Sequence, residues 1–550
     1  NSSHHTDLNG EERLIVRRGE PFNIILHLKP GSKEFKLDES SFTFIVETGM
    51  SLSIFNYKSY QMLEFVLNIC VYTLTGDAVY MHNERKRKEY VLSQHGQIYK
   101  GTYKRIKGTP WNFGQFESGI LDICLKILDE NPKFVSDADK DCSARRNPIY
   151  VTRVLSAMIN SNDDRGVLVG EWYDFSGGVH PGAWIGSGDI LHKWAESGPV
   201  RYGQCWVFAA LACTVSRALG IPCRVVTNFR SAHDTDANLV IENLYNDNAE
   251  KISSDSIWNF HVWVDSWMTR PDLGPEYDGW QTSDPTPQEP SDGVFCCGPA
   301  SLRAIKEGEL TKKYDTPFIF AEVNADVVDM LHLSNGEVIR FSGSTKSVGC
   351  FISTKAVGSD ERHDITHQYK YPEGSKEERQ VYEKAQHHNK LQQRGEEPGL
   401  HLKVFFIVHC STSLITSDRL IQLSAFAFDK QTIDYSKTEK TIVLDEPDID
   451  IKLMGDATVN QPVTANLTLL NPLPEQLQDC SFTIEGVGLT DGKPITVKTG
   501  AVGPKEEAKA SVEFSPSSSG STVLLVNFDS NKLSNIKSFV NVVVKEGETN

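Results

Sequence analysis

The sequence predicts a multidomain protein with a β-sandwich at its N-terminal end, an α+β core and all-β modules at its C-terminal end. The chain of 550 residues is too long for one hydrophobic core, and roughly three or four domains are expected. Short runs that alternate apolar and polar residues fill residues 1–76 and return after residue 400. Between them, residues 77–389 change to mixed helix and strand patterns rich in Trp and Gly.

The domain boundaries follow from these changes. Leu14–Val16 is typical of the short strands expected in the sandwich. A polar helix is predicted to begin at Ser375 and to run to about Gln393, before a linker rich in Gly and Glu. We therefore expect a sandwich, a core, a linker and two β-modules, over residues 1–76, 77–389, 390–400, 401–446 and 447–546.

The core is organised around an apolar run, Cys205–Leu219, which ends in Gly220-Ile221-Pro222. Gly and Pro just after the last apolar residue predict a helix stop. Because the run is apolar on nearly all sides, the helix is expected to be buried. Cys205 then lies in the first turn, where unpaired N–H groups favour a thiolate. The alternative is a buried structural cysteine.

Two strands follow that could complete a catalytic site. Ile257–Trp267 alternates so that His261 lies on one face with Trp263, Asp265 and Trp267. A shorter strand begins at Gly279 and leads to Asp284 before a Pro. A cysteine on a helix followed by His and Asp on strands is the papain-type arrangement of nucleophile, base and orienting carboxylate. Taken singly, His261 could be a core histidine and Asp284 a turn residue.

Three longer motifs make the sequence resemble a known family. They are Tyr-Gly-Gln-Cys-Trp-Val-Phe-Ala from Tyr202, Trp-Asn-Phe-His-Val-Trp-Val-Asp-Ser-Trp-Met from Trp258, and Gly-Trp-Gln-Thr-Ser-Asp-Pro-Thr-Pro-Gln from Gly279. They are similar to motifs of the transglutaminase family, and most of all to its tissue-type members. The resemblance implies an N-terminal β-sandwich, an α+β papain-like catalytic core and two C-terminal immunoglobulin-like β-barrels. Against that pattern the sandwich and the first barrel are too short, so that segments of both are expected to be missing.

The family resemblance also implies a reaction. The Cys205 thiolate would attack the γ-carboxamide of a protein glutamine, with His261 moving protons and Asp284 holding the imidazole. The thioester would pass to a lysine of a second protein or to a polyamine, with deamidation by water as a side reaction. One alternative is a papain-like cysteine hydrolase or deamidase; another is a structural protein, which the presence of all three residues disfavours.

Two tryptophans are assigned roles by the same resemblance. The Trp172 indole N–H would join the Cys205 backbone N–H as an oxyanion donor. Trp258 would form a wall of the tunnel through which the amine enters and would exclude water. Without the resemblance, both are expected to be ordinary core residues.

Oxygen-rich clusters predict calcium as the cofactor, because calcium prefers carboxylate, carbonyl and water ligands. The resemblance supports all three clusters, while solvated turns are the alternative for the first two and a capping box at Ser375 for Glu378 in the third. The first comprises Asp234, Asp236, Asn238 and Asp255; the second, Ala157, Asn160, Asn162 and Asp164; the third, Asn324, Asp326, Glu373 and Glu378.

Guanine nucleotide binding, which tissue-type members show, is doubtful here. Lys104 is retained, but Arg105 stands where the family pattern has a base-stacking phenylalanine. His401 and Lys403 stand where two arginines would be, and neither reproduces the bidentate guanidinium. Ser161 replaces a cysteine of the family's redox switch. We therefore assign no nucleotide-binding residues.

Charge and cysteine usage limit the other possibilities. A net charge of −17 argues against a nucleic-acid partner and agrees with bound cations. No apolar stretch reaches membrane-spanning length. Eleven scattered cysteines do not form a disulfide framework, which favours the cytoplasm, with non-classical export left open.

Overall fold

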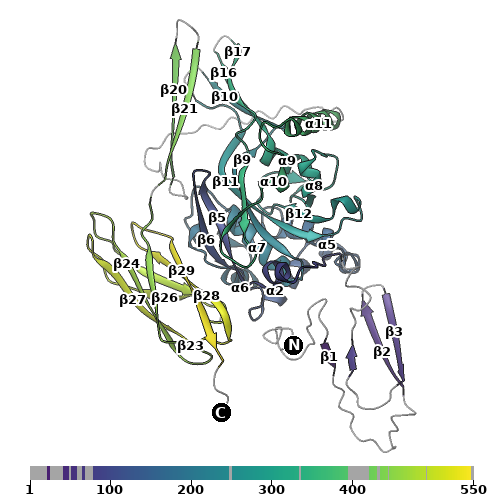
Figure 1. The fold of residues 1–550 in the computed structure, drawn as a ribbon, viewed down its shortest axis with the longest axis vertical. Coiled ribbons are helices and arrows are strands. Elements are labelled where there is room, and N and C mark those ends of the chain that lie inside the picture. The colour runs from purple at the N-terminus through teal and green to yellow at the C-terminus, as the bar shows by residue number, and fades with distance from the viewer. Residues whose placement is uncertain are drawn as a thin grey trace, which may run out of the picture.

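A computed structural model describes residues 78–246, 250–333, 336–393, 445–490 and 492–546, together with six strands outside these ranges. A six-stranded sheet at the centre of the core holds the residues of interest (Figure 1). Its strands run in the order β15 (Ala300–Ser301), β12 (Gly279–Ser283), β11 (Ser256–Met268), β9 (Cys223–His233), β18 (Cys350–Lys355) and β19 (Arg362–Asp364). All neighbouring strands are antiparallel.

The predicted central helix is α7, Cys205–Ala218, and it packs on β11 and β9. It ends where the sequence indicated, with Gly220 at φ 80° just beyond the last turn. Nearly every side chain of α7 is buried, and the helix forms one apolar cluster with α2 (Ile120–Asp129), α5 (Pro148–Met158) and α6 (Gly188–Ser197). The start of α7 is therefore fixed against the sheet.

A second group of helices packs around the other part of the sheet. Ile305, Ile319 and Tyr369 join Trp263 of β11 in a separate apolar cluster. These helices are α8 (Leu302–Lys306), α9 (Thr316–Asn324) and α10 (Thr366–Tyr369). Helix α11 (Lys376–Gln393) packs on α9 in a further apolar cluster, through Tyr382 and Phe320. The predicted polar helix is α11, and Ser375 accepts a hydrogen bond from the Glu378 N–H at its start.

The remaining core elements are short. Strand pairs and one three-stranded sheet comprise β5 (His95–Thr102) with β6 (Arg105–Asn112), β7 (Leu168–Gly170) with β8 (Val200–Gly203), β13 (Pro290–Ser291) with β14 (Val294–Phe295), and β10 (Val240–Asn246) with β16 (Asp326–His332) and β17 (Val338–Ser344). Short helices are α1 (Glu84–Arg87), η3 (Lys88–Leu92), α3 (Pro132–Ser136), α4 (Ala138–Ala144), η4 (Pro181–Ala183) and η5 (Pro275–Tyr277).

The C-terminal module consists of two facing sheets, as alternating strands predict. Val463 and Leu467 of one sheet share an apolar cluster with Phe482 and Phe528 of the other. One sheet contains β22 (Ile449–Met454), β24 (Val463–Leu470) and β27 (Glu507–Phe514); the other contains β23 (Ala457–Thr458), β29 (Ile536–Lys545), β28 (Gly520–Asp529), β25 (Ser481–Glu485) and β26 (Ile495–Lys498).

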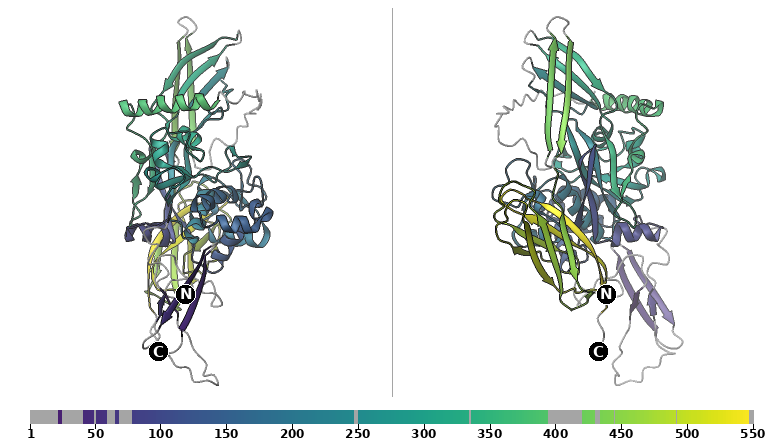
Figure 2. Two further views of the ribbon diagram at one scale, coloured as in Figure 1. Left: turned by 90° about the vertical axis from the view of Figure 1, so that its right-hand side faces the viewer. Right: turned by 60° about the vertical axis from the view of Figure 1, so that its left-hand side comes forward.

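The six outlying strands form three antiparallel pairs (Figure 2). They are β1 (Phe22–Ile24) with β4 (Phe65–Leu67), β2 (Ser41–Thr48) with β3 (Ser51–Lys58), and β20 (Leu420–Asp429) with β21 (Asp434–Val443). The first two pairs belong to the predicted sandwich and the third to the predicted first barrel. His401 and Lys403 lie outside the described residues.

The C-terminal module docks on the core beside β6. Asn112 donates a hydrogen bond to the Glu485 carboxylate over 3.3 Å, and Lys537 donates to the Trp184 carbonyl. Burial raises the pKa of Glu485 to about 8. Apolar contact comes from Ile185 against Val523 and Leu525 of the module.

Because the module has its own apolar cluster, it should lose stability separately from the core. Phe482→Ala removes a fully buried ring that packs 4.9 Å from Phe528, between ring centroids. We expect the module's free energy of unfolding to fall by about 3–5 kcal/mol. All nine tryptophans lie in the core. Urea unfolding followed by far-UV circular dichroism should therefore shift more than unfolding followed by Trp fluorescence.

Val543→Ala is the matched control, since Val543 is 68 % exposed. It should change neither transition by more than about 0.5 kcal/mol. Equal shifts of both signals in Phe482→Ala would show that the module and core unfold as one unit.

Candidate active site

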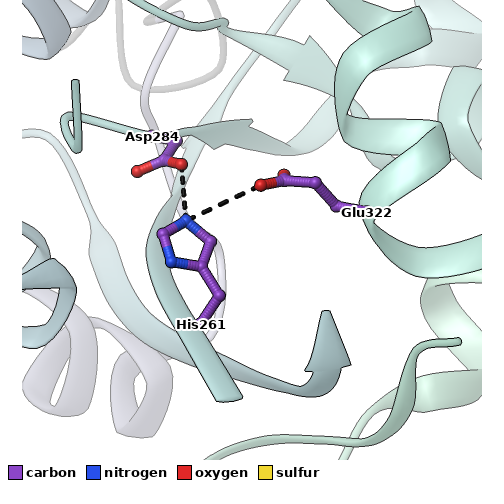
Figure 3. Close-up of side chains that lie close together, drawn as sticks. All are labelled: His261, Asp284 and Glu322. Atoms are coloured by element: carbon purple, nitrogen blue, oxygen red, sulfur yellow. Dashed lines mark hydrogen bonds and ion pairs between the residues drawn. The ribbon is translucent and has the colours of Figure 1, made fainter. Parts of the chain in front are cut away.

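Adjacent strands bring His261 and Asp284 together. In β11 His261 lies opposite Asn228 of β9, and Asp284 follows the last residue of β12 on the other side of β11. His261 Nε2 lies 2.6 Å from Asp284 Oδ2, and both side chains are about 1 % exposed (Figure 3). The second Asp284 oxygen accepts the Thr286 N–H over 2.9 Å, which fixes the carboxylate. The imidazole is thus held through Nε2.

Cys205 is the third member of the predicted triad. It is the first residue of α7, is 4 % exposed, and belongs to the apolar cluster that α7 forms with β11. His261 Nδ1 is buried and has no hydrogen-bond partner among the described residues. With Nε2 committed to Asp284, Nδ1 is the ring nitrogen left to exchange a proton with a thiol, as in a papain-type site.

Trp172 is brought close to the start of α7 by a parallel strand pair. Gly170 of β7 pairs with Gly203 of β8, so Trp172 and Cys205 each stand two residues beyond paired positions. A Cβ at Gly170 would lie 2.9 Å from the Trp172 ring and 3.4 Å from Phe208 of α7. The Glu171 carboxylate accepts a hydrogen bond from the backbone N–H of Trp172 over 2.8 Å. This Gly therefore lets the indole lie close to the backbone.

Trp258 lies on β11 itself. Its ring packs edge-on against His261 with centroids 5.1 Å apart, and its indole N–H donates to Ser256 Oγ over 3.0 Å. The His233 ring also packs edge-on against Trp258, with ring centroids 6.0 Å apart. The hydrogen bond and the two ring contacts fix the indole next to the imidazole.

Two further side chains reach the pair, and the sequence analysis missed both. Glu322 of α9 is buried, and its Oε1 lies 3.6 Å from His261 Nε2 (Figure 3). The Gln288 carboxamide nitrogen lies 2.8 Å from both Asp284 Oδ2 and Glu322 Oε1. Burial, and then the charge of Asp284, raise the pKa of Glu322 well above its usual range. Gln288 belongs to the third sequence motif, whereas only an acid inside the apolar run of α9 marks Glu322.

Comparison with known proteins decides the family. Models described as "Transglutaminase family", "Transglutaminase-like superfamily" and "Transglutaminase family, C-terminal ig like domain" match residues 1–66, 187–285 and 447–546. Human protein-glutamine gamma-glutamyltransferase 2 is 41 % identical, over 98 % of this chain and 97 % of its own length. The chain belongs to the transglutaminase family. Human protein-glutamine gamma-glutamyltransferase 5 is 37 % identical over 99 % of this chain and 97 % of its own length.

The crystal structure of red sea bream transglutaminase matches this structure with a TM-score of 0.78 at 34 % identity, covering 100 % of this chain and 98 % of that one. The predicted fold class is confirmed, and the chain is an enzyme of the transglutaminase class. The human type 2 alignment spans 667 positions, whereas this transglutaminase has 550 residues. At least 117 aligned positions (667 less 550) therefore have no counterpart in this chain.

The first predicted calcium cluster of this transglutaminase gathers buried acids in one place. Asp234 and Asp255 are both nearly buried, and Asp236 lies in the same loop. Burial raises the pKa of Asp234 to about 6, and burial followed by the charge of Asp255 raises that of Asp236. Burial, followed by the charges of Asp255 and Asp236, also raises the pKa of Glu242, which the sequence analysis did not include. Such mutual repulsion fits a site that a cation would stabilise.

In the same loop, backbone N–H groups already occupy several of these oxygens. Asp234 accepts from Asp236, Asn238 and Leu239, and the Asn238 side chain accepts from Val240. These bonds shape a tight turn.

In the third cluster, side-chain cations pair with the predicted ligands. Arg379 contacts both oxygens of Asp326 at 3.0 Å and also binds Glu378, while Lys370 pairs with Glu373. Asn324 is the last residue of α9 and is 4 % exposed. The acids are assembled, but a cation would have to displace Arg379. The Glu378 carboxylate binds Arg379 and only its N–H joins the cap at Ser375.

The second cluster forms a turn at the end of α5. The Ala157 carbonyl accepts the Asn160 N–H, and the Asn160 amide donates to the Pro285 and Phe295 carbonyls. The Asn160 Oδ1 accepts the Asn162 N–H, and Asp164 accepts the Gly166 N–H. Burial raises the pKa of Asp164 to about 6. Asn160 thus ties α5 to the segment that follows Asp284.

The structure describes two of the four positions considered for nucleotide, Lys104 and Arg105. Arg105 is exposed and pairs with Asp445, and Lys104 lies over the Tyr103 ring at 5.4 Å. Ser161 donates its hydroxyl to the Leu168 carbonyl over 2.9 Å. Among the helices in the described ranges, none is long and apolar enough to cross a membrane.

Proposed function

We propose that this transglutaminase is a protein-glutamine γ-glutamyltransferase that acts through a Cys205 thioester. The supporting observation is the buried His261–Asp284 pair, with 2.6 Å between Nε2 and Oδ2, in which His261 comes from the strand against which the helix of Cys205 packs. The human relatives of types 2 and 5 carry this activity in their names. The geometry of the site and the names of the relatives therefore favour the same reaction, which is acyl transfer from a protein glutamine.

The reaction proceeds in two steps. The Cys205 thiolate attacks the glutamine amide carbon, and the C–N bond breaks as His261 Nδ1 gives a proton to the departing ammonia. An amine then attacks the thioester, His261 accepts its proton, and the thiolate leaves. Asp284 holds Nε2–H throughout and stabilises the imidazolium without itself becoming protonated.

The two tryptophans divide the remaining work. Trp172 donates its indole N–H to the tetrahedral oxyanion together with the Cys205 N–H, each worth on the order of 3 kcal/mol of barrier. Trp258 packs on His261 and limits the access of water to the thioester. Acceptors are then protein lysines and polyamines, and deamidation to glutamate is the side reaction.

The competing proposal is a papain-like hydrolase or deamidase, which would use the same triad with water as acceptor. The relatives' names favour transfer over hydrolysis. A reducing compartment such as the cytoplasm is part of this proposal, and none of the described cysteines is in a disulfide. Guanine nucleotide is not proposed as a ligand.

Calcium is proposed as the activating ion. Asp234, Asp236, Asn238 and Asp255 would hold it, with Glu242 close by, because the repulsion among these carboxylates needs a compensating charge. When bound, calcium supplies that charge and orders the loop. Strand β9 ends at His233, directly before Asp234, and pairs with β11 opposite His261. An ordered loop would therefore steady the strand next to the site.

The first experiment tests the nucleophile. Cys205→Ala should abolish incorporation of a fluorescent amine into a glutamine-bearing protein and should also abolish ammonia release, because no covalent route remains. Cys213→Ala is the control, as Cys213 lies on the same helix, fully buried, and should leave both signals in place. Deamidation that persists in Cys205→Ala would refute the triad.

The second experiment tests the role of Trp258. Trp258→Ala should raise the ratio of ammonia released to amine incorporated, because it exposes the thioester to water. Trp172→Ala should instead lower both rates by roughly 10²–10³-fold through the loss of an oxyanion donor. An unchanged ratio in Trp258→Ala would exclude a water-excluding role.

The third experiment tests the calcium site. Asp234→Ala with Asp236→Ala should raise the calcium concentration needed for half-maximal amine incorporation, with little loss at saturation. Magnesium should substitute poorly, because it demands a stricter octahedral shell.

Asp450→Ala with Asp456→Ala removes the same charge from exposed sites on the C-terminal module and should not move the calcium curve. Superimposable curves for the Asp234/Asp236 variant and the wild type would contradict this site.

A further inference from the structure

The Gln288 carboxamide occupies the space between two buried carboxylates. Its nitrogen lies 2.8 Å from Asp284 Oδ2, 2.8 Å from Glu322 Oε1 and 3.0 Å from His261 Nε2. Gln288 follows Asp284 by four residues, and its own N–H is bonded to the Thr286 carbonyl over 2.9 Å. The side chain therefore reaches back from a constrained turn to the pair that holds the imidazole.

Hydrogen counting assigns the contacts. His261 Nε2 carries one hydrogen, and the 2.6 Å contact with Asp284 uses it. At 3.6 Å Glu322 is too far to share that hydrogen. The amide nitrogen has two hydrogens and faces two carboxylate oxygens, which gives one bond to each. Its 3.0 Å approach to Nε2 is then a contact between two donors.

Gln288 also separates two groups that compete for His261. Asp284 and Glu322 both face Nε2 from different elements (Figure 3), and both are buried. Without an N–H between them, Glu322 Oε1, which lies 3.6 Å from Nε2, would compete with Asp284 for the single Nε2–H. Glu322 Oε2 has no hydrogen-bond partner among the described residues, so Gln288 provides the side-chain donor that holds this group.

We propose that Gln288 is a positioning residue, which keeps Asp284 as the partner of His261 and holds Glu322 at a distance. The inference rests on the proposed function, since it specifies how His261 Nδ1 stays directed at the Cys205 thiol. The carboxamide touches no reacting atom. It acts through Asp284, whose place on Nε2 determines the orientation of the ring.

The test compares Gln288→Met with the wild type in the full-length chain. Methionine keeps the length of the side chain but donates no hydrogen bond. We expect kcat for amine incorporation into a glutamine peptide to fall roughly ten- to hundredfold. This loss is no larger than the ~10²-fold that a general acid–base residue contributes at the least, because His261 itself is retained. The KM should change less than about twofold, because no substrate contact is lost. Iodoacetamide should alkylate Cys205 more slowly at neutral pH, and the pH dependence of the alkylation rate should shift to higher pH.

Gln115→Met is the matched control. Gln115 is buried, whereas Gln288 is half-buried, but the Gln115 amide nitrogen likewise donates two hydrogen bonds, to the Val91 and Ser93 carbonyls. A general loss of stability would lower the melting temperature of both variants. Only Gln288→Met should change the pH profile of alkylation.

Glu322→Gln provides the second test. In the Gln288→Met background it replaces the competing carboxyl group with an amide, within 4.8 Å of the Asp284 carboxylate. The double variant should recover at least part of the lost kcat, which is a coupling that independent structural roles would not give.

The inference is overturned if the wild type incorporates amine and Gln288→Met keeps its kcat and its alkylation profile. It is also overturned if Glu322→Gln only adds to the loss. If neither the wild type nor Gln115→Met transfers acyl groups, the proposed function fails instead.

Discussion

The site depends on one buried hydrogen bond, from His261 to Asp284. A buried imidazole could rotate or exchange its tautomers unless a fixed acceptor held one nitrogen. Adjacent antiparallel strands supply that acceptor, and the Thr286 N–H fixes its second oxygen. Because Nε2 is held, Nδ1 is left for the thiol. The long β11 strand, with α7 packed across it, keeps the two halves of the site together.

Burial also brings acidic side chains close together, and neighbouring hydrogen-bond donors and cations compensate them. Asp284 and Glu322 bring two carboxylates to one imidazole, and Gln288 donates to both. At the far end of α9, Asn324 approaches the cluster in which Arg379 and Lys370 neutralise three acids. Charges near this helix are thus paired internally, whereas Asp234 is held by backbone N–H groups, and burial raises its pKa. This difference makes the Asp234 loop the better candidate for a cation.

Local patterns predicted the elements that carry the proposed triad. The apolar run and Gly220 defined α7, and alternation with aromatic residues defined β11, because both signals are contained in short stretches. The contacts of Gln288 and Glu322 could not be predicted, since α9 reaches His261 only through tertiary packing. The Arg379 ion pairs were missed for the same reason. Residues 401–419, where part of the first barrel was expected, lie outside the described ranges.

The central claim is that Cys205 carries the acyl group, and trapping the intermediate tests it most directly. The enzyme would be mixed with calcium and a glutamine peptide without an amine acceptor, quenched in acid within the first turnover, digested and examined by mass spectrometry. The account predicts an acyl adduct, equal to the peptide less ammonia, on the fragment that contains Cys205. Ammonia release without that adduct, or with an adduct on another cysteine, would contradict it.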